Sequence, residues 1–410
     1  MKTSKNKGLV TAILLTFVGV LFVGVVIVVG ILFFNEKILM VSTDEFPTIS
    51  SAVIAADPGD IILVKAKEDG TPYEENVVID KENIKLIGIG KEKPVLDGTA
   101  ALGPDGITIN NPGVLVNNFI VKNFTNNGIL VDSSDGNMIK GNNVNENNAR
   151  GITLDGSDSN MIKGNNVNQN GTRGILLLNG ADSNMIKGNN VNENVQRGIF
   201  LDDDSDSNII KGNNVNQNGQ RGITLDISDS NMIIGNKVNE NGRRGIHLNI
   251  SANNTVIGNK VNENGTLGIF LSSSDNNMFK GNKVNENVSD GILLSNSTSN
   301  MMKGNNINGN SGQGIEFRNS TSNLIKGNTV NNNVDNGIFL DGSDKNFIKG
   351  NRANGNGDDG ILLNEFSSDN DVFFNRAFDN TFDIVDQLLS NNNNFKGNKC
   401  GTSVPTDICD

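Results

Sequence analysis

Apolar residues recur along most of this chain at a period of 23 or 24 residues, in the same places within each repeat. A Gly-Ile pair marks every copy and begins at Gly128, Gly151, Gly174, Gly198, Gly222, Gly245, Gly268, Gly291, Gly314, Gly337 and Gly360. Leu, Val or Phe follows each Ile by two residues, and a mostly-Ile column and a mostly-Val column come later. Short apolar runs separated by Gly, Asn and Ser favour strands over helices. The period is too short for paired-helix repeats, so each copy predicts one coil of a parallel β-solenoid, with coils about 4.8 Å apart.

Asparagine fills further columns between the apolar ones. One column contains Asn137, Asn160, Asn184, Asn208, Asn231, Asn254, Asn277, Asn300, Asn323 and Asn346. Asn tolerates the left-handed backbone region, and its amide can bond to the coils above and below. The high Asn content is therefore interpreted as structural.

The segment before the repeats predicts the start of the solenoid. Residues 46–60 read as a short amphipathic helix, with Ile49, Val53 and Ile54 at helical spacing. Strand-like runs follow at 61–66, 76–79 and 84–90, and residues 94–98 close this part. We expect a cap and the first coils over 46–105, Asn-rich coils over 106–384, and a C-terminal cap over 385–410.

The N-terminus predicts a membrane anchor. Residues 1–7 carry three lysines, and the 27 residues from Gly8 to Phe34 carry no charge. As a helix this run spans about 40 Å, enough to cross a bilayer. A cleaved signal peptide is the alternative, but its apolar core is usually shorter. We expect a cytoplasmic tail (1–7), a transmembrane helix (8–34) and a linker (35–45), with the remainder extracellular or periplasmic.

The net charge and the cysteines limit the kinds of partner and the compartment that suit this chain. The chain has 34 basic and 46 acidic residues and a net charge of −12, which argues against binding nucleic acid. Its two cysteines, Cys400 and Cys409, would form a disulfide outside the cell. Metal ligation by this pair is the weaker alternative.

Residues 46–98, which include "PTISSAVIAADPGDIILV", "YEENVVI" and "PVLDG", resemble the first coils of right-handed parallel β-helix proteins. The Asn-rich repeats resemble coils of the NosD-type and pectate-lyase-like superfamily. The resemblance implies an all-β, single-stranded parallel β-helix. It implies no catalytic residue, because the Asp-Pro-His-Asp, Gly-His-Gly and Arg-Ile-Lys motifs and the Trp signatures of its enzyme members are absent.

A column of arginines precedes the Gly-Ile pair in five successive copies: Arg150, Arg173, Arg197, Arg221 and Arg244. Asp155, Asp202 and Asp226 lie four residues after the glycine, and a column of alternating Glu and Gln lies five residues before it. One interpretation is charge balance between exposed groups. The other is a groove for an anionic polymer, since guanidinium groups bind carboxylate or phosphate in bidentate fashion.

The outward position of the same strand is unexpectedly apolar and includes Phe200 and Phe270, with the single histidine, His247, between them. If this stripe is exposed, a loop, a partner or a sugar face must cover it. His247 alone cannot build a transition-metal site and is interpreted as a surface residue.

Three further features have a structural and a functional interpretation. The acidic turn of Asp202, Asp203, Asp204 and Asp206 is a weak calcium candidate, with a solvated turn as the alternative. The Met column beginning at Met138 would fill core corners, and Cu(I) binding is the remote alternative. A Lys column beginning at Lys140 is expected as a solvated basic edge, with Lys237 and Lys260 compensating where it lapses.

We therefore expect a membrane-anchored β-helix scaffold or binding module for cell-wall or extracellular polysaccharide, or for a surface protein. It would be non-catalytic and need no cofactor, calcium aside. A divergent polysaccharide lyase or hydrolase with an Asp/Arg site is the principal alternative. An accessory role in copper-site maturation is another.

Overall fold

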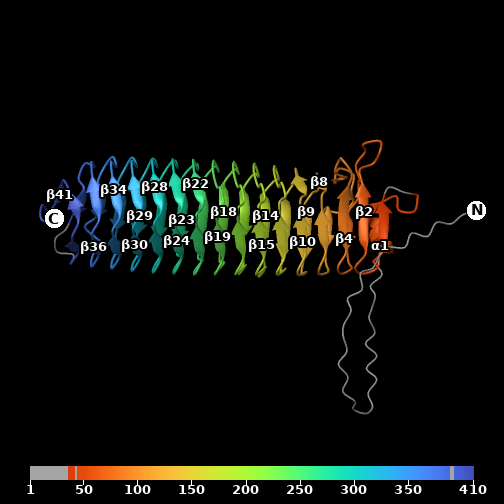
Figure 1. The fold of residues 1–410 in the computed structure, drawn as a ribbon, viewed down its shortest axis with the longest axis horizontal. Coiled ribbons are helices and arrows are strands. Elements are labelled where there is room, and N and C mark those ends of the chain that lie inside the picture. Colours follow the sequence, from red (N-terminus) through yellow and green to blue (C-terminus); the bar gives the residue numbers. More distant parts are fainter. Residues whose placement is uncertain (1–35, 42–43, 388–391) are drawn as a thin grey trace, which may run out of the picture. The chain divides into compact units, whose positions relative to one another are not determined.

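The computed structural model describes residues 36–41, 44–387 and 392–410. Glu36–Asp410 form one compact unit, a parallel β-solenoid whose coils stack in chain order from α1 to β41 (Figure 1). Each full coil has three faces, two of which carry a continuous sheet along the solenoid, and neighbouring coils pair in parallel. The all-β solenoid predicted from the repeat is confirmed.

The first face is a 16-stranded sheet, here called sheet A. Its strands are β1 (Ile38–Val41), β2 (Ile61–Lys65), β4 (Lys85–Ile89), β7 (Leu115–Asn117), β10 (Met138–Lys140), β13 (Met161–Lys163), β15 (Met185–Lys187), β17 (Ile209–Lys211), β19 (Met232–Ile234), β21 (Thr255–Ile257), β24 (Met278–Lys280), β27 (Met301–Lys303), β30 (Leu324–Lys326), β33 (Phe347–Lys349), β36 (Asp371–Phe373) and β39 (Asn394–Lys396).

The second face, sheet C, is 15-stranded. Its strands are β3 (Val77–Ile79), β6 (Ile107–Ile109), β9 (Asn127–Asp132), β12 (Arg150–Asp155), β14 (Arg173–Leu178), β16 (Arg197–Leu201), β18 (Arg221–Asp226), β20 (Ile246–Asn249), β23 (Ile269–Ser272), β26 (Ile292–Ser295), β29 (Ile315–Arg318), β32 (Ile338–Asp341), β35 (Ile361–Leu363), β38 (Ile384–Asp386) and β41 (Ser403–Val404).

The third face, sheet B, has two parts. The first comprises β5 (Val95–Asp97), β8 (Ile120–Lys122) and β11 (Asn143–Asn145), and the second comprises β22 (Lys260–Asn262), β25 (Lys283–Asn285), β28 (Asn306–Asn308), β31 (Thr329–Asn331), β34 (Arg352–Asn354), β37 (Arg376–Phe378) and β40 (Lys399–Cys400). Between Asn143 and Lys260 only single-residue bridges link successive coils on this face.

The core is built from like residues stacked on like. In the coil that begins at Gly151, the side chains of Ile152, Leu154, Ile162 and Val167 all point inward and are fully buried. Each of these side chains packs on its counterpart in the next coil, so the four predicted apolar columns are confirmed as the core. Burial of this kind contributes about 1.5–3 kcal/mol per side chain.

Buried Asn side chains form ladders at the three corners. At one corner Asn213 donates its backbone N–H to Asn236 Oδ1 (2.9 Å), and its Nδ2 donates to Ile186 O (2.9 Å). Each amide thus joins three successive coils, as predicted. The left-handed conformation was assigned to the wrong position, however: it belongs to the residue before the ladder Asn, such as Ser159 (φ 57°) or Asn253 (φ 59°).

The glycine of each Gly-Ile pair is required by close packing. A Cβ at Gly151 would overlap Val167 Cγ1 and lie 2.7 Å from Gly174 O. The strand bends at this residue, so that both Gly151 and Ile152 are buried. A side chain larger than hydrogen would force neighbouring coils apart.

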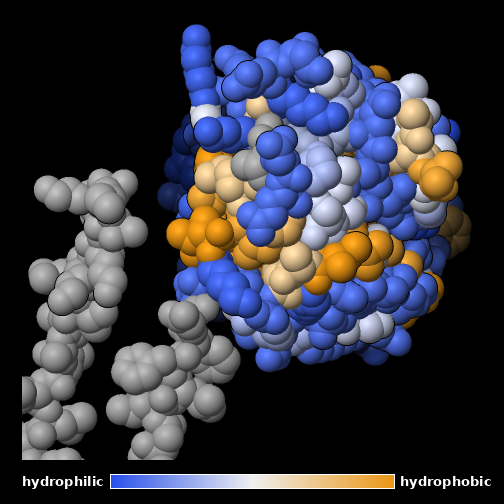
Figure 2. All heavy atoms as spheres, turned by 90° about the vertical axis from the view of Figure 1, so that its right-hand side faces the viewer, coloured by the Kyte–Doolittle hydropathy of each residue, from blue (hydrophilic) through white to orange (hydrophobic). Residues whose placement is uncertain are grey.

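Helix α1 (Ile49–Ala55) and β1 close the N-terminal end. Thr48 caps the helix by accepting from Ser51 N, and Ile49 and Val53 are buried, whereas Ile54 is 77% exposed, contrary to the expected apolar face. Strand β1 lies within the expected linker and begins sheet A. Apolar side chains form a band across this end of the solenoid (Figure 2).

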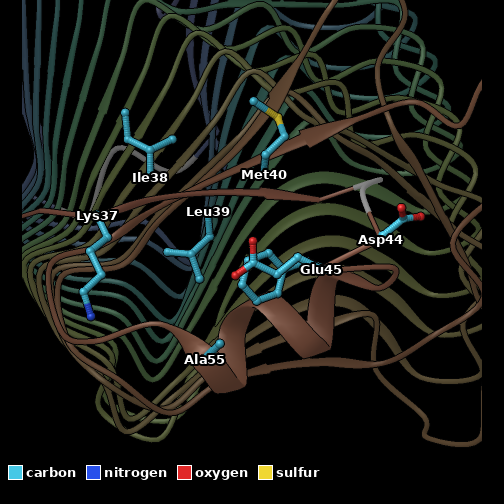
Figure 3. A pocket seen from close by; sticks show the side chains of 8 residues that line it. Lys37, Ile38, Leu39, Met40, Asp44, Glu45 and Ala55 are labelled. Carbon is cyan, nitrogen blue, oxygen red and sulfur yellow. The ribbon is translucent and has the colours of Figure 1, made fainter. Parts of the chain in front are cut away.

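A hollow of about 670 Å³ lies beside β1 and α1. Leu39 points toward Ala55 on the helix, whereas Ile38 and Met40 point to the other side of β1 (Figure 3). At the other end of the chain, a disulfide joins Cys400 and Cys409, with the Cα atoms 5.8 Å apart.

No helix in the described ranges is long and apolar enough to cross a membrane. The predicted transmembrane run 8–34 and the tail 1–7 lie outside those ranges.

Candidate functional site: an arginine strip on sheet C

The arginine column forms a continuous strip along the outer face of sheet C. Arg150, Arg173, Arg197 and Arg221 begin β12, β14, β16 and β18 and are direct register partners in neighbouring coils. Arg244 extends the row two residues before β20. Together these five residues are called the arginine strip. Their guanidinium groups repeat once per coil, because the sequence repeats once per coil.

The guanidinium groups lie over the neighbouring outward position. The guanidinium carbon of Arg197 is 4.1 Å from the centre of the Phe200 ring, and that of Arg173 is 5.0 Å from the same ring. Arg244 lies 4.4 Å from the centre of the Phe270 ring in the next coil. Cation–π contacts of this kind contribute about 0.5–2 kcal/mol each. Aromatic residues thus hold the cations in place without neutralising them.

The predicted exposed apolar stripe is buried where the strip covers it. Thr153, Leu176 and Phe200 are each 1% exposed, and Thr224 is fully buried. The guanidinium groups of Arg173 and Arg197 lie over the Phe200 ring and cover it. These outward side chains beneath the arginines are called the floor, and they form one surface with the arginine strip.

Ion pairing does not balance the strip. In residues 36–41, 44–387 and 392–410, no carboxylate lies within 4.0 Å of these arginines. Asp155 accepts from Asn179 (2.6 Å), Asp226 accepts from Asn249 (2.6 Å), and Glu193 accepts from Gln169 (2.8 Å). The neighbouring acids are thus used by amides of adjacent coils, and Asp202 and Asp226 offset part of the repulsion between the arginines only from a longer distance.

The strip is electrostatically strained. Burial lowers the pKa of Arg173, Arg197 and Arg221, and repulsion between neighbouring guanidinium groups lowers it further. The Nε atoms of the same three residues are buried without a hydrogen-bond partner. Burial also raises the pKa of Asp202, with repulsion from Asp203 as a second cause. An arginine remains cationic despite such shifts, so an incoming anion would relieve the repulsion.

His247 belongs to the floor and not to the surface. It is 5% exposed and stacks on Phe270, with ring centres 5.1 Å apart and planes 7° apart. Burial and the nearby Arg221, Arg244 and Arg197 lower the pKa of His247 to about 2. The imidazole is therefore neutral at physiological pH, and its role as a surface residue is corrected.

The structure gives no support to the calcium candidate. No group of three or more His, Cys, Asp or Glu side chains in the described residues is arranged to hold a metal ion. In the acidic turn, Asp203 and Asp204 are exposed, whereas Asp206 Oδ1 accepts the backbone N–H of Asp229.

The chain matches one family model. The right-handed β-helix region matches residues 105–261, 227–346 and 268–406, which together span most of the chain. The chain belongs to the right-handed β-helix family.

Solved structures of other β-helix proteins resemble the chain along most of its length. The A-module of a mannuronan C-5 epimerase from Azotobacter vinelandii has a TM-score of 0.58 at 16% identity, covering 86% of this chain and 93% of that one. A tailspike protein, Dettilon gp208, has a TM-score of 0.52 at 14% identity, covering 88% and 68%. At these identities the likeness concerns the fold. No curated protein sequence is significantly similar to the chain.

Beyond the strip, the same β-helix position has a different role. From Gly291 onward, the residue before each Gly-Ile pair accepts a backbone N–H of the next coil: Asp290 from Gln313, Gln313 from Asn336, Asn336 from Asp359, and Asp359 from Phe382. These four residues are called the ladder column. Their short side chains reach the backbone of the next coil.

A buried carboxyl group beside the ladder column was missed by the sequence analysis. Glu316 occupies the floor position, is 3% exposed, and accepts from Arg318 Nε and Nη2. Burial raises the pKa of Glu316 to about 7, and the neighbouring Asp290 contributes to this rise. Its signal was present in the sequence, since Glu316 is the one acid in an otherwise apolar, hydroxyl or histidine position.

The Met column was assigned to the wrong side of the β-helix. Met138, Met232 and Met278 point outward from sheet A and are 36–38% exposed. The Lys column lies on the same sheet and is exposed, as expected. Lys237 and Lys260 face outward from sheet B, so they do not compensate for the gap in the Lys column.

Proposed function

We propose that this β-helix protein is a non-catalytic binding module for an anionic polysaccharide, with the arginine strip as its binding site. The observation that carries the proposal is the row of half-buried guanidinium groups without carboxylate partners. An arginine in an ion pair would be neutral overall with its partner, but the arginines of this row retain their charge.

The ligand chemistry follows from the arrangement of the donors. The guanidinium groups repeat once per coil, about 4.8 Å apart, so they favour a polymer with closely repeated anionic groups over a single small anion. A chain of uronate residues offers a carboxylate on every sugar. Two neighbours in fold are named for enzymes that act on such a polymer, the mannuronan and alginate epimerases.

Membrane tethering through residues 8–34 is part of the same proposal. It would hold the binding module at a cell surface, where acidic polysaccharides are found. The support is the uncharged run of 27 residues after a lysine-rich start.

The experiment measures retention of polymannuronate, polygalacturonate and a neutral glucan by the full chain. We expect the acidic polymers to be retained without shortening or unsaturated products, and the neutral one to be released. Arg197→Ala with Arg221→Ala should weaken retention at least about 100-fold, since each of the two lost charged hydrogen bonds costs about 1.5–3 kcal/mol.

The matched control is Lys260→Ala with Lys283→Ala, which removes two cations from the exposed face of sheet B. This control should bind as the parent does. Equal weakening by both double variants would show that net charge acts rather than the strip. Release of unsaturated sugars would favour the lyase alternative.

A further inference from the structure

Sheet A presents a flat outer face with two parallel rows. In each three-residue strand of sheet A from β10 to β36 the middle residue is buried and the outer two point outward. Figure 1 shows β10, β15, β19, β24 and β30 following one another along one side of the solenoid. The first outward position forms an apolar row and the second forms a lysine row.

The apolar row is interrupted once, at Thr255, and is partly open to solvent. Its members are Met138, Met161, Met185, Ile209, Met232, Thr255, Met278, Met301, Leu324 and Phe347, each in register with the next. Ten strands at about 4.8 Å make a stripe about 45 Å long. Contiguous apolar surface of this extent is typical of an interaction site.

An acidic row borders the other side of the apolar row. Asp135, Asp158, Asp182 and Asp206 lie in the turn three residues before the first four members. Asp135, Asp158 and Asp182 each use Oδ1 to accept the N–H of the next Asp, and Asp206 accepts from Asp229. This arrangement fixes the row and leaves the second carboxylate oxygen available.

The acidic row and the lysine row are both unpaired. Lys140, Lys163, Lys187 and Lys211 are exposed, and none forms an ion pair within the described part of the chain. Burial and repulsion from Asp229 and Asp182 raise the pKa of Asp206. Across this face the order is therefore acid, apolar residue, lysine, repeated in four successive coils.

This order is complementary to itself under one rotation only. A twofold axis parallel to the solenoid places the apolar rows together and sets each acidic row against a partner's lysine row. A twofold axis across the solenoid would set lysine against lysine. We propose that sheet A is the interface of a homodimer in which two solenoids lie side by side and run in the same direction.

The size of the face suits a weak, reversible pair. The three residues of each sheet A strand at about 3.3 Å each give a width of about 10 Å, so two copies would bury roughly 900 Å² in total, with the acidic turns at the edge. The arginine strip lies on sheet C and stays open in this arrangement. The inference is thus independent of the proposed glycan binding.

Sedimentation velocity of the full chain in detergent tests the association. We expect a monomer–dimer equilibrium. The fourfold variant Lys140→Glu, Lys163→Glu, Lys187→Glu and Lys211→Glu should raise the dissociation constant at least about tenfold, since it sets acid against acid. The matched control, Lys237→Glu with Lys260→Glu and Lys283→Glu on sheet B, should leave it unchanged. A parent that stays monomeric at all concentrations overturns the proposal.

Cysteine cross-linking in native membranes tests the orientation without relying on that variant. Met161→Cys should cross-link to itself. Ser159→Cys, on the acidic side, should cross-link to Lys163→Cys when the two chains are co-expressed. Efficient self-linking of Lys163→Cys would place the lysine rows together and contradict the parallel arrangement. Absence of any link at these positions would contradict the interface itself.

Discussion

The position before the Gly-Ile pair acts in two ways along one solenoid. From Arg150 to Arg244 it carries long cationic side chains that lie over an apolar floor and leave their donors unused. From Asp290 to Asp359 it carries short side chains that bind the backbone of the next coil. The backbone coil is nearly the same in both regions. A repeat can therefore devote one column to stability in one region and to binding in another.

The first prediction tests whether the glycine of the Gly-Ile pair is equally closely packed in both regions. Gly222→Ala in the arginine region and Gly314→Ala in the ladder region should each destabilise the protein by about 3–5 kcal/mol. A new Cβ would overlap Val238 or Val330 and lie 2.6–2.8 Å from a carbonyl of the next coil. Chemical denaturation measures both. Gly164→Ala, at an open turn (φ 63°), should cost only about 1 kcal/mol of backbone strain. A tolerant Gly222 or Gly314 would refute this close packing.

The second prediction concerns the response of the arginine region to acid. The folded-state pKa of His247, about 2, lies below its unfolded value of 6.5, so its contribution to stability is lost as pH falls below 6.5. His247→Phe should remove this loss and gain up to about 3 kcal/mol over the parent at pH 4. Denaturant melts of both proteins at pH 4 and pH 8 give the difference. An equal difference at the two values would contradict a buried neutral imidazole.

The third prediction is that substitutions at the position before the Gly-Ile pair change stability in opposite directions in the two regions. Asn336→Leu should cost about 2 kcal/mol, because it removes a ladder acceptor and leaves the N–H of Asp359 unpaired. Arg197→Met should be neutral or stabilise by about 1 kcal/mol, since it keeps the cover over Phe200 but removes a half-buried, unpaired charge. Urea unfolding compares them. Destabilisation by both would mean that the arginines also hold the fold together.

The smallest expected effect belongs to the ladder region and appears as pH rises from about 4.5 toward 7. Because burial raises the pKa of Glu316 to about 7, the folded state binds the proton more tightly, and stability falls as pH rises from about 4.5 to 7. The melting temperature should drop by about 1–3 °C between pH 5 and pH 8. Glu316→Gln should reduce this drop. A steeper drop in the variant would show that the carboxylate is stabilised by Arg318 instead.

The repeat itself made the fold predictable. Columns such as Ile152 and Val167 allow one stacking, and a one-residue slip would expose every apolar side chain. Strand β1 was not predicted because Ile38–Val41 precede the repeat and have no counterpart within it. The disulfide partners were predictable because the sequence offers no other pair.

The site was harder to predict than the fold. The residues of the arginine strip were visible as a column, but whether Arg197 would meet Asp202 or the Phe200 ring depends on side-chain conformation. The sequence also did not reveal that Asn179 and Asn249 donate to the nearby carboxylates, because donor and acceptor lie in different coils. The outward direction of Met138 followed from strand alternation with Ile139, which could have been applied to the Met column.

Because of the Asn ladders, the length of the β-helix can change only in steps of one whole coil. Each ladder Asn forms its hydrogen bonds with the coils on either side of it. An inner coil can therefore be duplicated or deleted whole while the cross-section of the β-helix stays the same. The extra residue of the 24-residue coils is absorbed in the turns at Gly180 and Asp204 without shifting a rung. Duplicating the coil from Arg173 to Gln196 would lengthen the strip by one guanidinium group. The length of the β-helix, and of the arginine strip on it, could thus be changed one coil at a time.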